Sequence, residues 1–173
     1  MPVAMNCCMQ CGARLVRKYL PSEGREIPYC EACGDFRFPF FNTAVSMIVL
    51  TPDLQRVLLI RQYGRPDYIL VAGYVNQGED AEDAVCREVR EETGLTVART
   101  RFNHSHFFVP SNTLMLNFTA VCTDDRVHEN SEVDTWSWFS PEEARRNIRP
   151  HSLAKSFLEG YLDGHWTFEP PRP

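Results

Sequence analysis

Three glutamates at the end of a short acidic segment have the spacing of a metal site. Between Glu79 and Glu92 the chain carries seven acidic residues and two basic ones. On a helix with about 100° between residues, Glu88, Glu91 and Glu92 project into one sector about 100° wide. Such like charges repel by about 0.2–0.5 kcal/mol per pair, so the crowding brings a structural helix no gain. Clustered carboxylates suit Mg²⁺ or Mn²⁺, and the alternative is a solvated charged face.

Four cysteines near the N-terminus have the spacing of a structural zinc site. They form two Cys-x-x-Cys-Gly motifs, with Cys8 and Cys11 in the first and Cys30 and Cys33 in the second. Two tight turns of this kind present four thiolates in a tetrahedron, which leaves no coordination position for water. We therefore predict one structural Zn²⁺ per chain, with disulfides or a redox dithiol as the alternatives.

The pattern of apolar residues predicts the elements that position these groups. Strands are predicted at 44–50, 56–62, 68–72, 101–109, 113–122 and 133–139. A helix is predicted over 80–92, with Asp80 as its N-cap and Gly94 as its stop. Two further helices are predicted to begin near Ser140 and Ser152. Strands mixed with helices indicate an α/β fold in which helices cover a mixed sheet.

Composition and charge exclude several classes of function. The chain has 173 residues, of which 43% are hydrophobic and 24% charged, a mixture typical of globular proteins. No apolar run reaches the roughly 18 residues of a membrane span, and the N-terminus has no secretory signal. We therefore expect a cytoplasmic protein that has no membrane partner. The net charge of −5 is concentrated in residues 79–92, and the neutral remainder argues against non-specific duplex binding.

The acidic segment also matches a family motif, the Nudix box, Gly-x₅-Glu-x₇-Arg-Glu-U-x-Glu-Glu-x-Gly-U, where U is aliphatic. Every fixed position is present: Gly73, Glu79, Arg87-Glu88-Val89, Glu91-Glu92 and Gly94-Leu95. The chain therefore resembles a Nudix hydrolase, which implies an α/β/α sandwich with a mixed β-sheet, here preceded by a small zinc ribbon. The resemblance further implies that a metal-activated water attacks a nucleoside diphosphate. It makes Glu88, Glu91 and Glu92 catalytic metal ligands and gives Gly73, Glu79, Arg87 and Gly94 structural roles.

Motifs outside the box resemble the NADH pyrophosphatase (NAD⁺ diphosphatase) branch of this family. The zinc ribbon lies just upstream of the box, and residues 36–39, 114–118 and 132–139 resemble segments of that branch. The resemblance implies that Glu132 and the backbone of Ala72 are further ligands of the catalytic metal. Glu91, followed by Glu132, is our candidate for the general base. The predicted domains are a zinc ribbon at 1–39, a Nudix domain at 40–165 and a tail at 166–173.

Substrate contacts are expected from aromatic rings that can stack on nicotinamide or adenine. That branch has Ser-Gln-Pro-Trp downstream of the box, and this chain has Ser105-His106-Phe107-Phe108 there. The resemblance also implies a ligand contact at Ala154. The candidate set is Phe38, Tyr74, His106, Phe107, Phe108, Thr113 and Ala154. Core packing is the alternative for each aromatic ring.

Together these features predict divalent-metal-dependent hydrolysis of the diphosphate linkage of NAD(H) to nicotinamide mononucleotide and AMP. One alternative is hydrolysis of ADP-ribose or another nucleoside diphosphate derivative, including NAD-capped RNA. A non-catalytic, nucleotide-sensing module is the other. The expected partner is a small dinucleotide or nucleoside diphosphate substrate, and NAD-capped RNA and a homodimer are left open.

Overall fold

The chain folds into two compact units, each of which is described by itself. A computed structural model describes residues 5–128 and 133–166. The smaller unit contains residues 5–42 together with Phe108–Thr113. The larger unit contains Thr43–Phe107 and the described residues from Leu114 onward.

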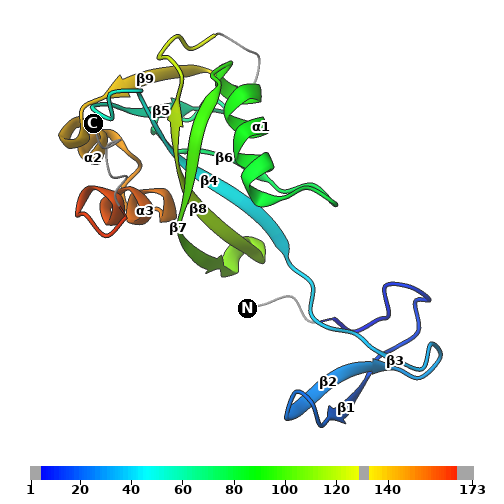
Figure 1. The fold of residues 1–173 in the computed structure, drawn as a ribbon. Helices are drawn as coiled ribbons and strands as arrows, with labels where there is room; N and C mark the ends of the chain where they lie inside the picture. The colour runs from blue at the N-terminus through cyan, green and yellow to red at the C-terminus, as the bar shows by residue number, and fades with distance from the viewer. Residues whose placement is uncertain (1–4, 129–132, 167–173) are drawn as a thin grey trace. The chain divides into compact units, whose positions relative to one another are not determined.

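Three short antiparallel strands form the sheet of the smaller unit (Figure 1). They lie in the order β1 (Val16–Leu20), β2 (Arg25–Cys30) and β3 (Asp35–Phe36). Among the described residues of this unit, the buried apolar side chains are Cys8, Ile27, Pro28 and Cys30. A core this small requires a further cross-link for stability, and the cysteine cluster described below is placed to provide it.

The larger unit is built on a six-stranded sheet with the order β7-β8-β4-β5-β9, in which β6 pairs with β4. Its strands are β4 (Asn42–Leu50), β5 (Val57–Arg61), β6 (Val71–Tyr74), β7 (Val97–Phe108), β8 (Thr113–Cys122) and β9 (Thr135–Phe139). A short 3₁₀ turn, η1 (Val109–Ser111), connects β7 to β8. The β4–β5, β4–β6 and β5–β9 pairs are antiparallel.

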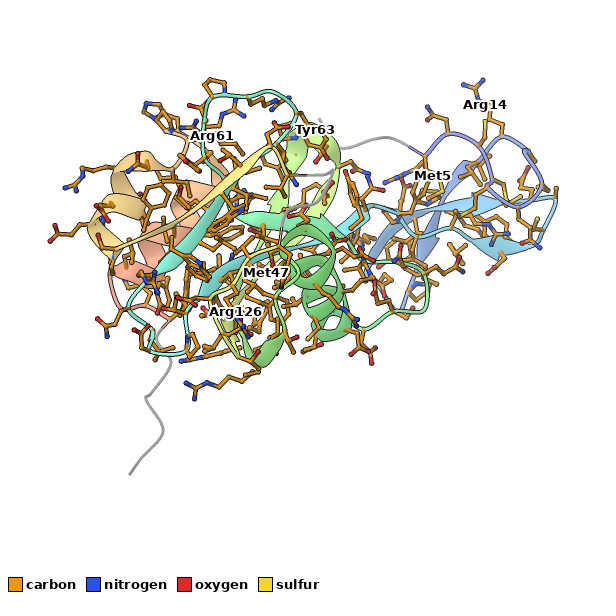
Figure 2. The ribbon with its side chains drawn as sticks, turned by 90° about the horizontal axis from the view of Figure 1, so that it is seen from above. Met5, Arg14, Met47, Arg61, Tyr63 and Arg126 are labelled. Carbon is orange, nitrogen blue, oxygen red and sulfur yellow. The ribbon has the colours of Figure 1, made fainter. Side chains whose placement is uncertain are left out.

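Helices cover both faces of this sheet, so the fold is the expected α/β/α sandwich with a mixed sheet (Figure 1). Side chains on a strand alternate between faces. Accordingly, Val45 and Met47 of β4 pack with α1 (Ala81–Thr93), whereas Ile48 and Leu50 pack with α2 (Pro141–Asn147) and α3 (Leu153–Leu162). Met47, labelled in Figure 2, is one of the fully buried side chains on the α1 side.

The helices begin and end close to the predicted residues. Gly94 stops α1 in the left-handed conformation, and its N–H donates to the carbonyl of Arg90. Asp80 occupies the N-cap of α1, but its side chain accepts no capping hydrogen bond. Ser140 forms a reciprocal capping box with Glu143 at the start of α2. In the described ranges, no helix has the length and apolar character needed to cross a bilayer.

Two strands differ from the prediction. The third predicted strand, 68–72, is displaced, because Tyr68 and Ile69 form only isolated bridges, to Ile148 and Ile60, and β6 begins at Val71. The strand predicted at 101–109 begins four residues earlier, at Val97. Residues 97–100 are exposed or half-buried at this edge of the sheet, so they lack the alternation on which the prediction relied.

Candidate active site

The glycine of the box makes room for the first glutamate of the acidic cluster. Gly73 lies on β6, which packs beside α1, and its partner across the sheet is Val45. A methyl group built on Gly73 would lie 1.9 Å from the carboxyl carbon of Glu88 and 2.0 Å from its Oε1. The carboxylate of Glu88 therefore fills the space that a side chain at this position would need, and its side chain is only 12% exposed.

Arg87 organises the polar groups around this carboxylate. Its Nε and Nη2 donate to the two oxygens of Glu79 at 2.7 and 2.9 Å. Its Nη1 donates to Oε1 of Glu88 at 2.7 Å and to Oε2 of Glu91 at 2.9 Å. Its Nη2 also donates to the carbonyl of Tyr74 at 2.9 Å, which ties the loop after β6 to α1. The Arg87 hydrogen bond lowers the pKa of Glu79 to about 2, and Glu79 in turn raises the pKa of Arg87.

The three glutamates of the predicted sector do not all face the same way. Glu92 is 6% exposed and its Oε1 accepts a 2.7 Å hydrogen bond from the side-chain amide of Gln62. Glu91 is 53% exposed on the solvent side. In the described part of the chain, the three carboxylates are not close enough for one oxygen of each to lie within 4.8 Å of the other two. The sector lies at the edge of the buried face, so its two sides have different surroundings.

This arrangement fits a divalent cation. Glu88 and Glu91 already share one positively charged donor, Nη1 of Arg87, so their oxygens converge on a position that holds positive charge. The donors are carboxylate oxygens, which hard cations such as Mg²⁺ and Mn²⁺ prefer. An open hollow on the outer side of α1, lined by Cys86, Arg87, Arg90 and Glu91, gives access to Glu91 from solvent.

The four cysteines of the two motifs come together in the smaller unit. One sulfur from each of Cys8, Cys11, Cys30 and Cys33 lies within 4.8 Å of the other three. Two of these approaches join different motifs, at 3.5 Å between Cys11 and Cys30 and 4.0 Å between Cys8 and Cys33. None of the seven cysteines forms a disulfide. A cluster of four sulfurs at these separations can hold a metal ion, as predicted.

An arginine that the sequence analysis did not single out lies against this cluster. The Nε of Arg37 donates to Sγ of Cys8 at 3.2 Å. Its Nη1 and Nη2 donate to the carboxylate of Asp35 and the side-chain oxygen of Gln10. The hydrogen bond from Arg37 lowers the pKa of the Cys8 thiol to about 6. Hydrogen bonds to the sulfurs of Cys11 and Cys30 raise the pKa of Cys33 to about 12. Arg37 therefore favours the thiolate form at Cys8.

The predicted substrate contacts are distributed over both units. Tyr74 is 57% exposed and follows Gly73 directly, while Ala72 precedes it on β6. His106 and Phe107 lie on β7 of the larger unit. Ala154 lies on α3, which packs on the opposite face of the sheet from α1.

The remaining candidates belong to the smaller unit or lie outside the described ranges. Phe38 and Phe108 are exposed residues of the smaller unit. Thr113 is buried in that unit, and its hydroxyl is within hydrogen-bond distance of two oxygens of Ser111. Glu132 lies outside the described residues.

Neither Gln62 nor Arg37 was predicted from the sequence to lie at these sites. Gln62 is 30 residues from Glu92 in the chain, and only the position of β5 beside α1 brings the two together. No rule based on the spacing of residues in the sequence predicts a pair this far apart. Arg37 lies in the segment 36–39, in which only Phe38 was predicted to contact a ligand.

Comparison with known proteins shows to which family the chain belongs. The family model of the NUDIX domain matches residues 41–159. A Pseudomonas aeruginosa protein named NAD-capped RNA hydrolase NudC is 33% identical over 158 residues, which cover 90% of this chain and 55% of the relative. A Deinococcus radiodurans protein of the same name is 32% identical over 167 residues, which cover 88% of this chain and 58% of that protein. The chain thus spans little more than half the length of either relative.

A solved structure of a NUDIX hydrolase has a similar fold. The crystal structure of a NUDIX hydrolase from Nitrosomonas europaea superposes with a TM-score of 0.69, covering 92% of this chain and 91% of that one. The two sequences are 20% identical, so this likeness concerns the fold alone. With the family model matching more than half of its length and all fixed positions of the box present, the chain belongs to the Nudix family.

Proposed function

We propose that this chain hydrolyses the diphosphate linkage of NAD(H) to nicotinamide mononucleotide and AMP with the help of Mg²⁺ or Mn²⁺. The observation that carries the proposal is the convergence of Glu88 and Glu91 on one cationic position beside Gly73. A diphosphate is repelled by such a carboxylate cluster unless divalent cations intervene. The names of the relatives, which refer to NAD-capped RNA, support a substrate that contains the NAD diphosphate.

The ligands of the cation would be Glu88, Glu91 and Glu92, with the backbone of Ala72. When bound, divalent cations neutralise the charge on the diphosphate and lower the pKa of water toward neutrality. The oxygen of a water molecule then forms a bond to phosphorus while the anhydride P–O bond breaks, so that each product leaves with one phosphate. Glu91 is the first candidate to accept the proton from that water, because its side chain is 53% exposed. Glu132 is the second candidate.

Tyr74 is the aromatic residue best placed to stack on the substrate. Arg87 holds its carbonyl at 2.9 Å, so the backbone beside Gly73 is fixed to α1 while the ring stays 57% exposed. Stacking on an aromatic ring contributes about 0.5–1.5 kcal/mol beyond the area buried. Phe38, His106, Phe107, Phe108, Thr113 and Ala154 remain predicted contacts.

We further propose that the cysteine cluster holds one structural Zn²⁺. Its sulfurs provide four ligands, which complete the tetrahedral coordination of zinc and leave no open position for chemistry. The smaller unit has few buried apolar residues, so metal binding would contribute directly to its folding free energy. The cytoplasmic location and the homodimer stay predictions.

A substrate panel tests the proposal. The purified chain is incubated with Mn²⁺ and NADH, NAD⁺, ADP-ribose, nucleotide sugars, dinucleoside polyphosphates or an NAD-capped RNA oligonucleotide, and the products are identified by mass spectrometry. We expect cleavage of NADH at the diphosphate. Preferred cleavage of ADP-ribose or of the capped RNA would favour the corresponding alternative substrate. If no compound is cleaved, the remaining alternative is a non-catalytic, nucleotide-sensing module.

Three variants connect activity to the cluster. Glu91→Gln and Glu92→Gln should each lower turnover by orders of magnitude while the fold persists, because each removes a proposed ligand of the cation. Glu82→Gln, which neutralises an exposed acid in the first turn of the same helix, is the matched control and should keep wild-type turnover. Unchanged turnover in both of these variants would contradict the proposed roles of Glu91 and Glu92.

A further inference from the structure

A buried amide lies against the innermost glutamate of the cluster. Gln62 directly follows β5 and is 6% exposed, and its Nε2 donates to Oε1 of Glu92 at 2.7 Å. Glu92 is also 6% exposed. The hydrogen bond therefore connects the sheet to the last turn of α1 at a point where water has little access.

As a purely structural contact this pair brings little stability. Removing a carboxylate from water carries a large free-energy penalty, toward which the Gln62 amide contributes one neutral hydrogen bond. Replacing a buried polar pair by apolar groups of the same shape is often neutral or stabilising. The amide does fix the orientation of the Glu92 carboxylate. A hydrogen bond to Oε1 restricts rotation of the carboxylate and so sets the direction in which Oε2 points.

Gln62 is itself held in place from both sides. The backbone carbonyl of Arg61 accepts from the N–H of Asp134 at 2.9 Å, and the N–H of Gly64 donates to Oδ2 of Asp134 at 2.7 Å. The Arg61 guanidinium also lies 4.0 Å from the centre of the Tyr68 ring. Arg61 and Tyr63, the neighbours of Gln62 in sequence, are labelled at this end of the sheet in Figure 2. The amide thus projects from an anchored segment.

We infer that Gln62 is a positioning residue that orients the carboxylate of Glu92 toward a bound divalent cation. The inference rests on the proposed function, because it takes Glu92 to be a ligand of that cation. Partners that hold a metal-binding carboxylate in place commonly change metal affinity or activity by about 10–100-fold when they are lost. Across residues 5–128 and 133–166, the side chain of Gln62 makes this one hydrogen bond, so its substitution isolates a single interaction.

Binding of Mn²⁺ alone tests the inference without reference to activity. Gln62→Leu removes the donor at similar volume, and free Mn²⁺ is counted by electron paramagnetic resonance during a titration of the zinc-loaded protein. We expect the apparent dissociation constant for Mn²⁺ to rise at least about tenfold. In the Glu92→Gln background, Gln62→Leu should cause no further change in Mn²⁺ affinity, because the oriented carboxylate is absent.

Thr119→Val is the matched control. It removes the two side-chain hydrogen bonds between the buried Thr119 and Asn103 on the neighbouring strand, at nearly constant volume. Its Mn²⁺ affinity should equal that of the wild type even where its stability falls. Wild-type affinity in a folded Gln62→Leu protein would overturn the inference about Gln62 alone. Failure of the wild type to bind Mn²⁺, or an unchanged affinity in Glu92→Gln, would instead overturn the proposed metal site.

A measurement on the wild type keeps the inference testable where Gln62→Leu does not fold. The side-chain amide of Gln62 gives its own nitrogen–proton signal in a ¹⁵N-labelled sample. This signal should shift on addition of Mg²⁺ with the same saturation as the backbone amides of α1. A Gln62 side-chain signal that stays in place at saturating Mg²⁺ would overturn the inference.

Discussion

Adding one methyl group at Gly73 provides a sharp test of the site. The methyl would lie 1.9–2.2 Å from three atoms of the Glu88 carboxylate, so the carboxylate has to leave its place beside β6. Gly73 does not have the left-handed conformation that restricts other residues, so alanine brings no backbone strain. Overpacking of this kind typically costs about 1–3 kcal/mol, and we expect Gly73→Ala to lower the free energy of unfolding by that amount.

A second substitution tests whether this cost comes from the clash with the Glu88 carboxylate. In a Glu88→Ala background the space beside Gly73 is vacated, so the added methyl no longer clashes. There Gly73→Ala should be neutral or stabilising by about 0.4–1 kcal/mol, because it reduces the conformational entropy of the unfolded chain. The two substitutions are therefore predicted to couple by about 1–4 kcal/mol in a double-mutant cycle, the difference between these two effects.

Urea unfolding followed by tryptophan fluorescence measures these differences. All three tryptophans, at 136, 138 and 166, belong to the larger unit, so the signal reports the unit that contains Gly73. Turnover measured in parallel should fall in Gly73→Ala to the level of Glu88→Gln. Wild-type turnover in Gly73→Ala, or an equal loss of stability with and without Glu88, would show that the methyl group and the carboxylate do not compete for this space.

Three further predictions concern the ion pair, the metal cluster and the end of α1. Because Arg87 lowers the pKa of Glu79 from 4.5 to about 2, their pair stabilises the fold above about pH 4.5 and loses this contribution as the pH falls toward 2. The stability difference between wild type and Glu79→Gln should therefore shrink over that range, and a constant difference in acid titrations would contradict the assignment. Zinc analysis should find one ion per chain. Chelation of this zinc should increase hydrogen exchange in residues 5–42 and have little effect on tryptophan fluorescence. Unchanged hydrogen exchange after zinc loss would exclude a structural role. Gly94→Ala should lower thermal stability by about 1–3 kcal/mol, because φ is +72° and a methyl would lie 2.8 Å from His128, whereas an unchanged melting temperature would mean that the end of α1 adapts freely.

The parts of the fold that follow from local chemistry were predictable from the sequence. The capping box at Ser140 and the stop at Gly94 depend on neighbouring residues and occur where predicted. The four cysteines also converge as their spacing indicated. Asp80 has the residue type of an N-cap, yet its side chain makes no capping bond, so residue type alone did not determine this contact.

The interior of the candidate site was less predictable, because it depends on contacts between distant segments. Helical spacing placed Glu88, Glu91 and Glu92 in one sector but gave no information on what lies beside it. Arg87 draws Glu88 and Glu91 together, whereas Gln62, which directly follows β5, holds Glu92. Spacing within one helix cannot predict a partner from a distant segment of the chain.

Anomalous diffraction from a crystal soaked in Mn²⁺ would locate the bound cations without reference to activity, and the proposed function depends on where they bind. We expect an anomalous peak among the carboxylates of Glu88, Glu91 and Glu92 beside Gly73, with Arg87 released from at least one of the first two and still paired with Glu79. Manganese bound only elsewhere, or no peak in this region at millimolar Mn²⁺, would contradict the proposed metal site.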